Sequence, residues 1–183
     1  MLSMLLVTAA WALPPVPAPL TITVDEQATL DAGDVVFRNS STGQSIAILD
    51  VASSPSAVMT AVMDLAPRVD DIGALLEFSQ YDEGPGTKAA QWRLGASVYS
   101  ATFHVLYEYD LNAGWCVYTL DTSKDNDISS TDGSYQVYAN GAGSRLIYRS
   151  SQQSSILPAW LMQRFSREGA EELLTGIARR AGG

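Results

Sequence analysis

The side chains that most often carry catalytic or metal chemistry are scarce in this sequence. His104 is the only histidine and Cys116 the only cysteine among 183 residues. Without a cysteine pair or a second histidine at ligand spacing, we predict no metal site. A general base must point into a cavity, and strand alternation puts His104 opposite the nearby aromatic residues. Cys116 lies in an apolar run, and we interpret it as a small buried hydrophobe.

One acidic segment has the spacing of a calcium-binding loop. Oxygen-bearing side chains occupy positions 1, 3, 5, 7, 9 and 12 of the segment from Asp121 to Asp132. Position 6 is Asn126 instead of glycine, position 12 is not glutamate, and the flanks have the pattern of strands. We therefore interpret it as a solvated hairpin loop. The sequence also lacks a G-x-S-x-G motif and a glycine-rich loop that opens a helix.

Aromatic residues recur along one face of several predicted strands and are suited to line an apolar pocket. In the run from Val98 to Tyr109, one face carries Phe103, Val105 and Tyr107, although apolar residues occur on both faces. The residues predicted to line the cavity are Phe103, Val105, Tyr107, Trp115, Val117, Tyr135, Val137, Leu146, Tyr148, Trp160, Leu161 and Phe165. If the cavity is an active site, the candidates for proton transfer are Tyr107, Tyr135, Tyr148 and Arg149.

Composition narrows the class of protein. A hydrophobic content of 46% with 17% charged residues is typical of a globular chain, and the length suits one domain. The net charge is −9, and the 11 Lys and Arg residues are scattered. This distribution argues against nucleic-acid binding and against a polybasic membrane site. A single cysteine allows no intrachain disulfide.

The N-terminus has the features of an export signal. Met1 to Ala12 has no charged residue, and Ala10-Trp11-Ala12 and Val16-Pro17-Ala18 resemble cleavage sites. We interpret residues 1–20 as a signal peptide and Pro-rich linker, followed by one domain over residues 21–183. If this leader is a signal peptide, the protein is periplasmic or extracellular. If it is not, we expect a cytoplasmic protein. The missing basic residue near the start keeps the alternative open that this is simply an apolar N-terminus. The segment is too short to span a bilayer.

The predicted elements are two strands, a helical region, six strands and a long helix. Ser54 and Pro55 favour a helix start that continues to Ala66, and a short helix or turn follows near Val69. We expect an irregular segment from Thr21 to Asp34. The strands are predicted at Val35–Arg38, Ile46–Val51, Ala74–Tyr81, Lys88–Leu94, Val98–Tyr109, Trp115–Leu120, Ser129–Tyr138 and Ser144–Ser150. This order predicts an α+β fold with an antiparallel sheet and the helices on one face.

The long helix, predicted from Leu157 to Arg180, has two apolar groups on different sides. They are Leu157, Trp160, Leu161 and Phe165, and Ala170, Leu173, Leu174 and Ile177. The groups are rotated by roughly 160° from each other. Either the helix bends near Gly169, or a curved sheet wraps around it. Asn140-Gly141 predicts a two-residue hairpin turn, or a loop extending to Gly143.

Four segments, in this order, resemble START-like helix-grip domains. Ser54-Pro55-Ser56-Ala57-Val58-Met59 with Asp64 resembles S-P-x-x-V-W…D, and Asp132-Gly133-Ser134-Tyr135 resembles x-G-S-W. Gly143-Ser144-Arg145-Leu146-Ile147-Tyr148-Arg149 resembles G-T-R-L-x-Y-R, and Leu157 to Leu174 resembles L-P-x-x-L…G-x-x-x-L-L. The similarity spans roughly Gly33 to Ala181 and is nearest to the polyketide cyclase/dehydrase and coenzyme Q-binding START-type branch of the SRPBCC superfamily. Many members have Y-P-x-W after the first helix, where this chain has Ala66-Pro67-Arg68-Val69.

The resemblance implies a helix-grip fold, a curved antiparallel β-sheet wrapped around a long C-terminal helix with an apolar cavity between them. Ligands of such folds are lipids, quinones or polycyclic products. We therefore predict non-catalytic binding or transport of a hydrophobic small molecule, with no cofactor, no nucleic acid and at most transient membrane contact. Two alternatives remain. A cyclase/dehydrase-type enzyme would place an acidic residue with a shifted pKa in the pocket, and a protein-interaction module would have a filled core and an exposed apolar patch.

Overall fold

The computed structural model describes residues 20–39, 44–96, 99–154 and 159–182, without the side chains of Ala96 and residues 159–165. The predicted leader, except for Leu20, lies outside the described residues. In chain order the elements are α1 (Val24–Asp31), β1 (Val36–Asn39), β2 (Ser45–Val51), α2 (Pro55–Met63), α3 (Arg68–Asp71), β3 (Leu75–Gly84), β4 (Thr87–Ala96), β5 (Tyr99–Asp110), β6 (Trp115–Leu120), β7 (Ser130–Asn140), β8 (Gly143–Gln153) and α4 (Ala159–Arg180).

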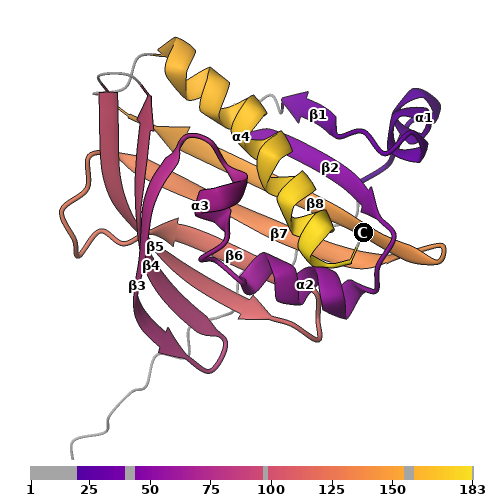
Figure 1. The fold of residues 1–183 in the computed structure, drawn as a ribbon, viewed down its shortest axis with the longest axis horizontal. Helices are drawn as coiled ribbons and strands as arrows, with labels where there is room; N and C mark the ends of the chain where they lie inside the picture. Colours follow the sequence, from indigo (N-terminus) through magenta and orange to yellow (C-terminus); the bar gives the residue numbers. More distant parts are fainter. Residues whose placement is uncertain (1–19, 40–43, 97–98, 155–158, 183) are drawn as a thin grey trace, which may run out of the picture.

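The described strands form one antiparallel sheet that is strongly curved (Figure 1). The strand order is β1-β2-β8-β7-β6-β5-β4-β3, so every neighbouring pair except β2 and β8 is consecutive in sequence. Helix α4 lies across the concave face and contacts β2 and β8, while α2 and α3 pack beside it. The predicted architecture, a curved antiparallel sheet around a long C-terminal helix, is confirmed.

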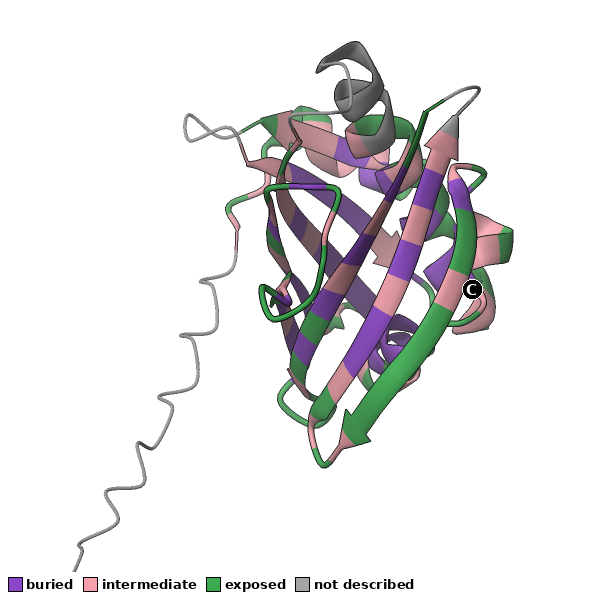
Figure 2. Ribbon diagram, turned by 90° about the vertical axis from the view of Figure 1, so that its left-hand side faces the viewer, coloured by how far each residue is buried: buried purple, intermediate pink, exposed green. Residues whose placement is uncertain are grey.

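Alternating burial along the strands defines the two faces of the sheet. Along β5, Ala101, Phe103, Val105 and Tyr107 are buried, and the residues between them are more exposed (Figure 2). Edge strand β3 is exposed over most of its length. The main core lies between the concave face and the helices, where α4 contributes Ala170, Leu173, Leu174 and Ile177. These four residues are the second apolar group predicted for this helix.

Helix α4 is continuous from Ala159 to Arg180, and the sheet curves around it. This arrangement corresponds to the wrapped-helix alternative. Leu157 and the side chains of Trp160, Leu161 and Phe165, which form the first apolar group, lie outside the described residues. None of the described helices is both long enough and apolar enough to cross a membrane.

Local sequence signals explain where α2 and the last hairpin begin and end. The Ser54 hydroxyl accepts a hydrogen bond from the Ala57 N–H (3.3 Å), and Pro55 is the first helical residue, as predicted. Asn140 pairs with Gly143, which leaves a two-residue turn with Gly141 at φ 57°. The shorter of the two predicted turns is therefore correct. A Cβ on Gly143 would overlap the carbonyl of Val51 at the end of β2, so the close approach of β8 to β2 at this point requires glycine.

Helix α1 corrects the expectation that residues 21–34 are irregular. Thr23 and Glu26 form a capping box, in which Thr23 N–H donates to the Glu26 carboxylate (2.8 Å). Leu30 is the only buried residue of the helix, so apolar periodicity could not predict it. The T-x-x-E spacing was the available signal. Leu30 packs on the convex face of the sheet in a second cluster with Val36, Ile46, Ile48 and Ile147.

Candidate ligand-binding cavity

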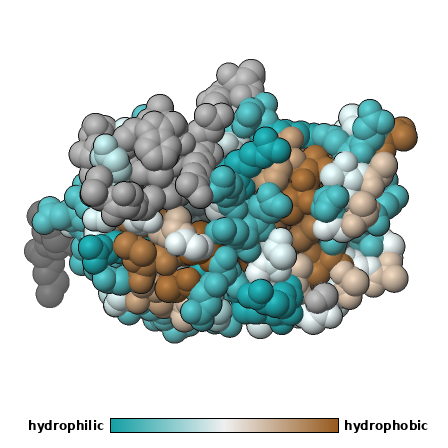
Figure 3. All heavy atoms as spheres, turned by 45° about the horizontal axis from the view of Figure 1, so that its top comes forward, coloured by the Kyte–Doolittle hydropathy of each residue, from teal (hydrophilic) through white to brown (hydrophobic). Residues whose placement is uncertain are grey.

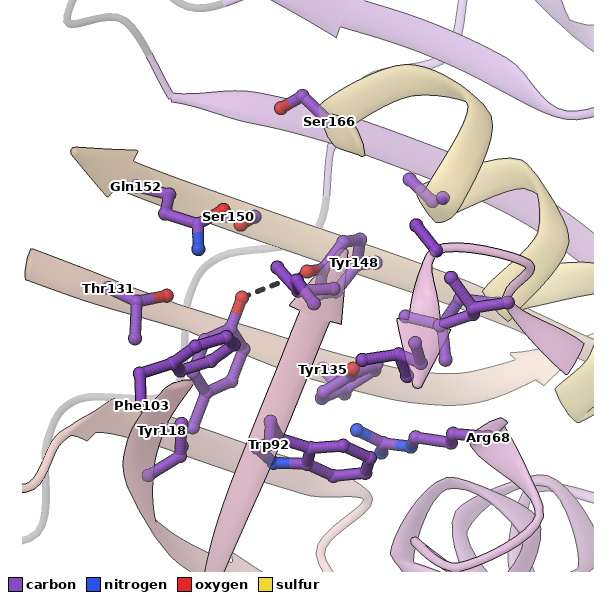
Figure 4. A pocket seen from close by; sticks show the side chains of 18 of the residues that line it. Arg68, Trp92, Phe103, Tyr118, Thr131, Tyr135, Tyr148, Ser150, Gln152 and Ser166 are labelled. Carbon is purple, nitrogen blue, oxygen red and sulfur yellow. Dashed lines mark hydrogen bonds between the residues drawn. The ribbon is translucent and has the colours of Figure 1, made fainter. Parts of the chain in front are cut away.

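A cavity of about 130 Å³ lies between the concave face of the sheet, α3 and α4 (Figure 4). Strands β3 to β8 supply most of its wall, and Ser166, Gly169, Ala170 and Leu173 close it from α4. An engineered apolar cavity of roughly 150 Å³ binds benzene. The space in the cavity therefore suits a group the size of one aromatic ring.

Six aromatic side chains give the cavity its apolar character, namely Trp92, Phe103, Tyr107, Tyr118, Tyr135 and Tyr148. Tyr118 lies near the centre of this group, with its ring centroid 5.9 Å from Tyr107, 6.0 Å from Tyr135 and 6.3 Å from Tyr148. Its hydroxyl donates to the Tyr148 hydroxyl (3.0 Å), and Trp92 Nε1 donates to the Tyr107 hydroxyl (2.9 Å). Burial raises the pKa of Tyr107 and Tyr118 above the ordinary range. These two hydroxyls are therefore neutral at physiological pH.

Arg68 supplies a positive charge at the inner end of the cavity. It is only 4% exposed, and its Nη2 donates to the Val62 carbonyl at the end of α2 (2.6 Å). The guanidinium carbon lies 5.2 Å from the ring centroid of Tyr135 and 5.9 Å from those of Trp92 and Tyr107. Its Nε has no hydrogen-bond partner. Cation–π contacts thus hold a buried charge that no carboxylate of the described residues neutralises.

The other end of the cavity is polar and uncharged. Thr131, Ser150 and Gln152 lie away from Arg68 on the sheet, and Ser166 faces them from α4 (Figure 4). Ser150, Gln152 and Ser166 are half-exposed. This end therefore gives access from solvent. Among the described lining residues there is no aspartate, glutamate or histidine.

The structure brings five of the predicted cavity residues together and places the others elsewhere. Phe103, Val105, Tyr107, Tyr135 and Tyr148 line the cavity. Val137 and Leu146 belong to the same core but are not in the cavity wall. The side chains of Trp160, Leu161 and Phe165 lie outside the described residues.

Trp115 and Val117 are on the opposite face of the sheet, which corrects the expected phase of β6. Cys116 and Tyr118 point into the concave core, so the alternating residues point outward. Val117 borders a shallow hollow on the convex face with Leu106 and Arg149. The side chain of Arg149, a candidate for proton transfer, is thus on the opposite face of the sheet from the cavity.

Arg68, Trp92 and Tyr118 are among the cavity residues that sequence reasoning missed. Trp92 alternates with Ala90 and Leu94 in β4, a pattern that was available from the sequence. Tyr118 follows from shifting the phase of β6 by one residue. For Arg68 the available signal was its place in Ala66-Pro67-Arg68-Val69, where the resemblance otherwise has Y-P-x-W.

The other chemical candidates are used for structure. His104 lies on the convex side of β5, with its ring nitrogens 3.3 Å from Asn126 Oδ1 and 3.2 Å from Gln91 Oε1. In the calcium-like loop, Asp121 accepts hydrogen bonds from Ser123 Oγ (2.6 Å) and the Tyr81 hydroxyl (2.7 Å). Cys116 is fully buried, and burial raises its pKa to about 12. No cluster of metal-ligating residues occurs in the described part of the chain.

No family model matches this sequence, and no curated protein is significantly similar to it. Solved structures do share its fold. The Zhui aromatase/cyclase from Streptomyces sp. R1128 has a TM-score of 0.66 at 10% identity, covering 80% of this chain and 94% of that one. A STAR-related lipid transfer protein from Xanthomonas axonopodis has a TM-score of 0.64 at 12% identity, covering 81% and 93%.

A protein from Thermus thermophilus also has a TM-score of 0.66, at 16% identity, and covers 75% of this chain and 96% of its own. Identities this low establish a common fold and nothing finer. The antiparallel sheet with a long C-terminal helix is the arrangement that these TM-scores match. The chain therefore has the helix-grip fold of START-like proteins.

Proposed function

We propose that this protein binds a lipid, a quinone or another hydrophobic small molecule in the cavity and does no chemistry on it. The observation that carries the proposal is the cavity itself, with buried aromatic walls, one inner charge and a half-exposed polar end. Binding pockets for small molecules have this composition, mostly apolar with a few placed polar groups. Proteins of the same fold include a lipid transfer protein and an aromatase/cyclase, which supports a hydrophobic ligand in general.

A cyclase/dehydrase-type reaction has less support. The described lining residues contain no carboxylate or imidazole to accept a proton near neutral pH. Burial raises the pKa of Tyr107 and Tyr135, so both hydroxyls stay protonated near neutral pH and cannot act as phenolate bases. As neutral groups, the two hydroxyls can instead form hydrogen bonds with a ligand.

An interaction module also has less support. It predicts a filled core and a continuous apolar patch. The large exposed hydrophobic residues instead occur on several elements, with Leu76 on β3, Leu106 on β5 and Leu111 in the following turn. From the side shown in Figure 3, polar side chains divide the apolar surface into separate areas.

The test is ligand binding by a cavity-blocking variant and a matched control. Ala170 is buried in α4 and lines the cavity, so Ala170→Phe should fill the space. Leu106 is 40% exposed on the convex side of β5, so Leu106→Phe adds a ring outside the cavity. Protein purified without detergent is analysed by native mass spectrometry, extracted with organic solvent and titrated with fluorescent lipids and quinones.

We expect the wild type and Leu106→Phe to bind equally, and Ala170→Phe to bind at least tenfold more weakly while remaining folded by circular dichroism. The proposal is wrong if the wild type carries no hydrophobic molecule and takes up none from the panel. Undiminished binding by Ala170→Phe would place the ligand elsewhere.

A further inference from the structure

We propose that Arg68 makes the cavity selective for hydrophobic molecules that carry a carboxylate, which pairs with the guanidinium at the inner end. This inference rests on the proposed function, because it names the chemical class of ligand for the same cavity. It starts from a charge that is buried in an aromatic environment and has no anionic partner among the described residues.

Arg68 retains its charge in this position. An arginine does not deprotonate in proteins, so burial does not neutralise it as it would a lysine. Buried charges are normally paired, because removing an ion from water costs several kcal/mol per ion. Here the partners are one carbonyl, that of Val62, and three ring faces. Both kinds of partner are neutral, so the site still carries a net positive charge.

The nearest acidic residues along α3 do not supply the missing charge. Asp71 has a side chain only 2% exposed, and it pairs with Arg179 (2.6 Å) and with Arg180 of α4. Asp70 lies with Asp71 and the glutamates of α4 in a hollow away from the cavity. The carboxylates nearest in sequence are therefore directed to the other side of α3.

The geometry leaves room for an acceptor on the ligand. Nη2 is engaged by Val62, and the ring centroids of Trp92, Tyr107 and Tyr135 lie within 5.9 Å of the guanidinium carbon. Nε is unpaired but covered by protein atoms, so Nη1 is the donor left for a ligand. Side chains fixed by packing lose little entropy on binding. A carboxylate would satisfy the donor and neutralise the charge, and charge-assisted hydrogen bonds of this kind are about twice as strong as neutral ones.

The size of the cavity limits the shape of the ligand. A space of about 130 Å³, open to solvent at its polar end, holds the acidic group with roughly one ring or a short chain. A longer ligand extends toward Ser150, Gln152 and Ser166, where half-exposed hydroxyl and amide groups suit a neutral polar end. The expected ligand is thus a hydrophobic acid that enters with its carboxylate first.

The test compares acids with their uncharged amides, which have nearly the same shape. Calorimetry at pH 7.5 measures naphthalene-2-carboxylate against naphthalene-2-carboxamide and decanoate against decanamide. The proteins are wild type, Arg68→Met and the control Arg93→Met. Arg93 is a 40% exposed arginine of β4 that pairs with Glu77 (2.8 Å). Arg93→Met therefore makes the same chemical change as Arg68→Met, but outside the cavity wall.

We expect the wild type and Arg93→Met to bind at least one acid tenfold or more tighter than its amide. In Arg68→Met the acid should weaken at least tenfold while the amide changes less than threefold. Equal or tighter amide binding by the wild type would overturn the inference, and so would an acid preference that persists in Arg68→Met. If neutral lipids or quinones bind and the acids gain nothing, only this inference fails. If no hydrophobe of any kind binds, the proposed function fails.

A second measurement uses the wild type alone, in case Arg68→Met does not fold. NMR of the ¹³C-labelled carboxylate gives its pKa in the bound and free states. Contact with Arg68 should lower the pKa of the bound acid, because the guanidinium stabilises its ionised form. A bound pKa above the free value would mean an apolar environment without ion pairing and would overturn the inference.

Discussion

Arg68 and Arg145 are almost equally buried, at 4% and 6% exposure, but their surroundings differ. On the convex side, Arg145 of β8 forms a two-pronged ion pair with Asp50 of β2, with Nε–Oδ1 and Nη2–Oδ2 distances of 2.7 Å. Its Nη2 also donates to Gln27 of α1 (2.8 Å). On the concave side, Arg68 lines a cavity and meets one carbonyl and three aromatic rings.

The difference separates a structural charge from one available to a ligand. Asp50 and Arg145 are direct partners in the β2–β8 register, so their ion pair joins strands that are far apart in sequence. Hydrogen bonding to Asp50 raises the pKa of Arg145, because the carboxylate stabilises the charged guanidinium. Arg68 has a comparable desolvation penalty without this compensation. The two arginines should therefore respond differently when their surroundings are changed.

The largest effect is expected from Asp50→Asn. This change leaves the buried Arg145 charge without its counterion, and removing one partner of a buried pair costs roughly 3–5 kcal/mol. Because the Asp50 side chain is 19% exposed, we expect a loss of about 3 kcal/mol in the free energy of unfolding. Urea denaturation measures it, and the double variant Asp50→Asn/Arg145→Met should recover part of the loss. A loss below about 0.5 kcal/mol would show that the pair is not structural.

The next effect concerns the Asp71 carboxylate, which pairs with Arg179 and Arg180 of α4 and not with Arg68. A Cβ on Gly176 of α4 would overlap the Asp71 carboxylate, so Gly176→Ala should destabilise the fold by about 1–3 kcal/mol. Gly169 of the same helix is the control, because its added Cβ would lie 3.7 Å from Ile72 Cγ2, an ordinary contact. Gly169→Ala should stabilise by up to about 1 kcal/mol through helix propensity. Thermal unfolding of both variants checks the contrast, and equal shifts would contradict it.

A smaller effect is expected from Arg68→Met. The variant loses one hydrogen bond and three cation–π contacts but removes an uncompensated buried charge. These contributions oppose each other, so we expect the free energy of unfolding to change by less than about 1 kcal/mol. Denaturant unfolding of the ligand-free protein is the measurement. A loss of 3 kcal/mol or more, on the scale of Asp50→Asn, would mean that Arg68 is structural too.

The smallest effect is a pH dependence of α1, the helix that supplies Gln27 to Arg145. Hydrogen bonding to Arg38 lowers the pKa of Glu26 to about 2, with Thr23 contributing. An ordinary glutamate has a pKa of about 4.3, so the folded state favours the ionised form. The resulting stabilisation is fully present above about pH 4.3 and is lost as the pH falls through about 2. The stability difference between wild type and Glu26→Gln should therefore shrink over this window, and a difference independent of pH would contradict the pairing.

Local signals in the sequence were enough for most elements. Ser54 and Pro55 located the start of α2, and the alternation from Val98 to Tyr109 located β5, because these signals act within a few residues. Which face of β5 is inward stayed open, since both faces contain apolar residues. Helix α1 was missed although its capping box was present, because a helix with one buried residue has almost no apolar period. In β6 both alternating sets contain an aromatic residue, Trp115 in one and Tyr118 in the other. Period alone could not choose between them.

The sequence by itself determined the order of strands and helices, the strand alternation and the caps, because each depends on neighbours in the chain. Only the tertiary structure decided which face of β6 is inward and which arginine has a counterion. Asp50 lies 95 residues from Arg145 in sequence, and the β2–β8 pairing brings them together. Asp71 is close to Arg68 in sequence, but its carboxylate pairs with Arg179 and Arg180 of α4. Charge compensation depends on distances in space, and these are set by packing.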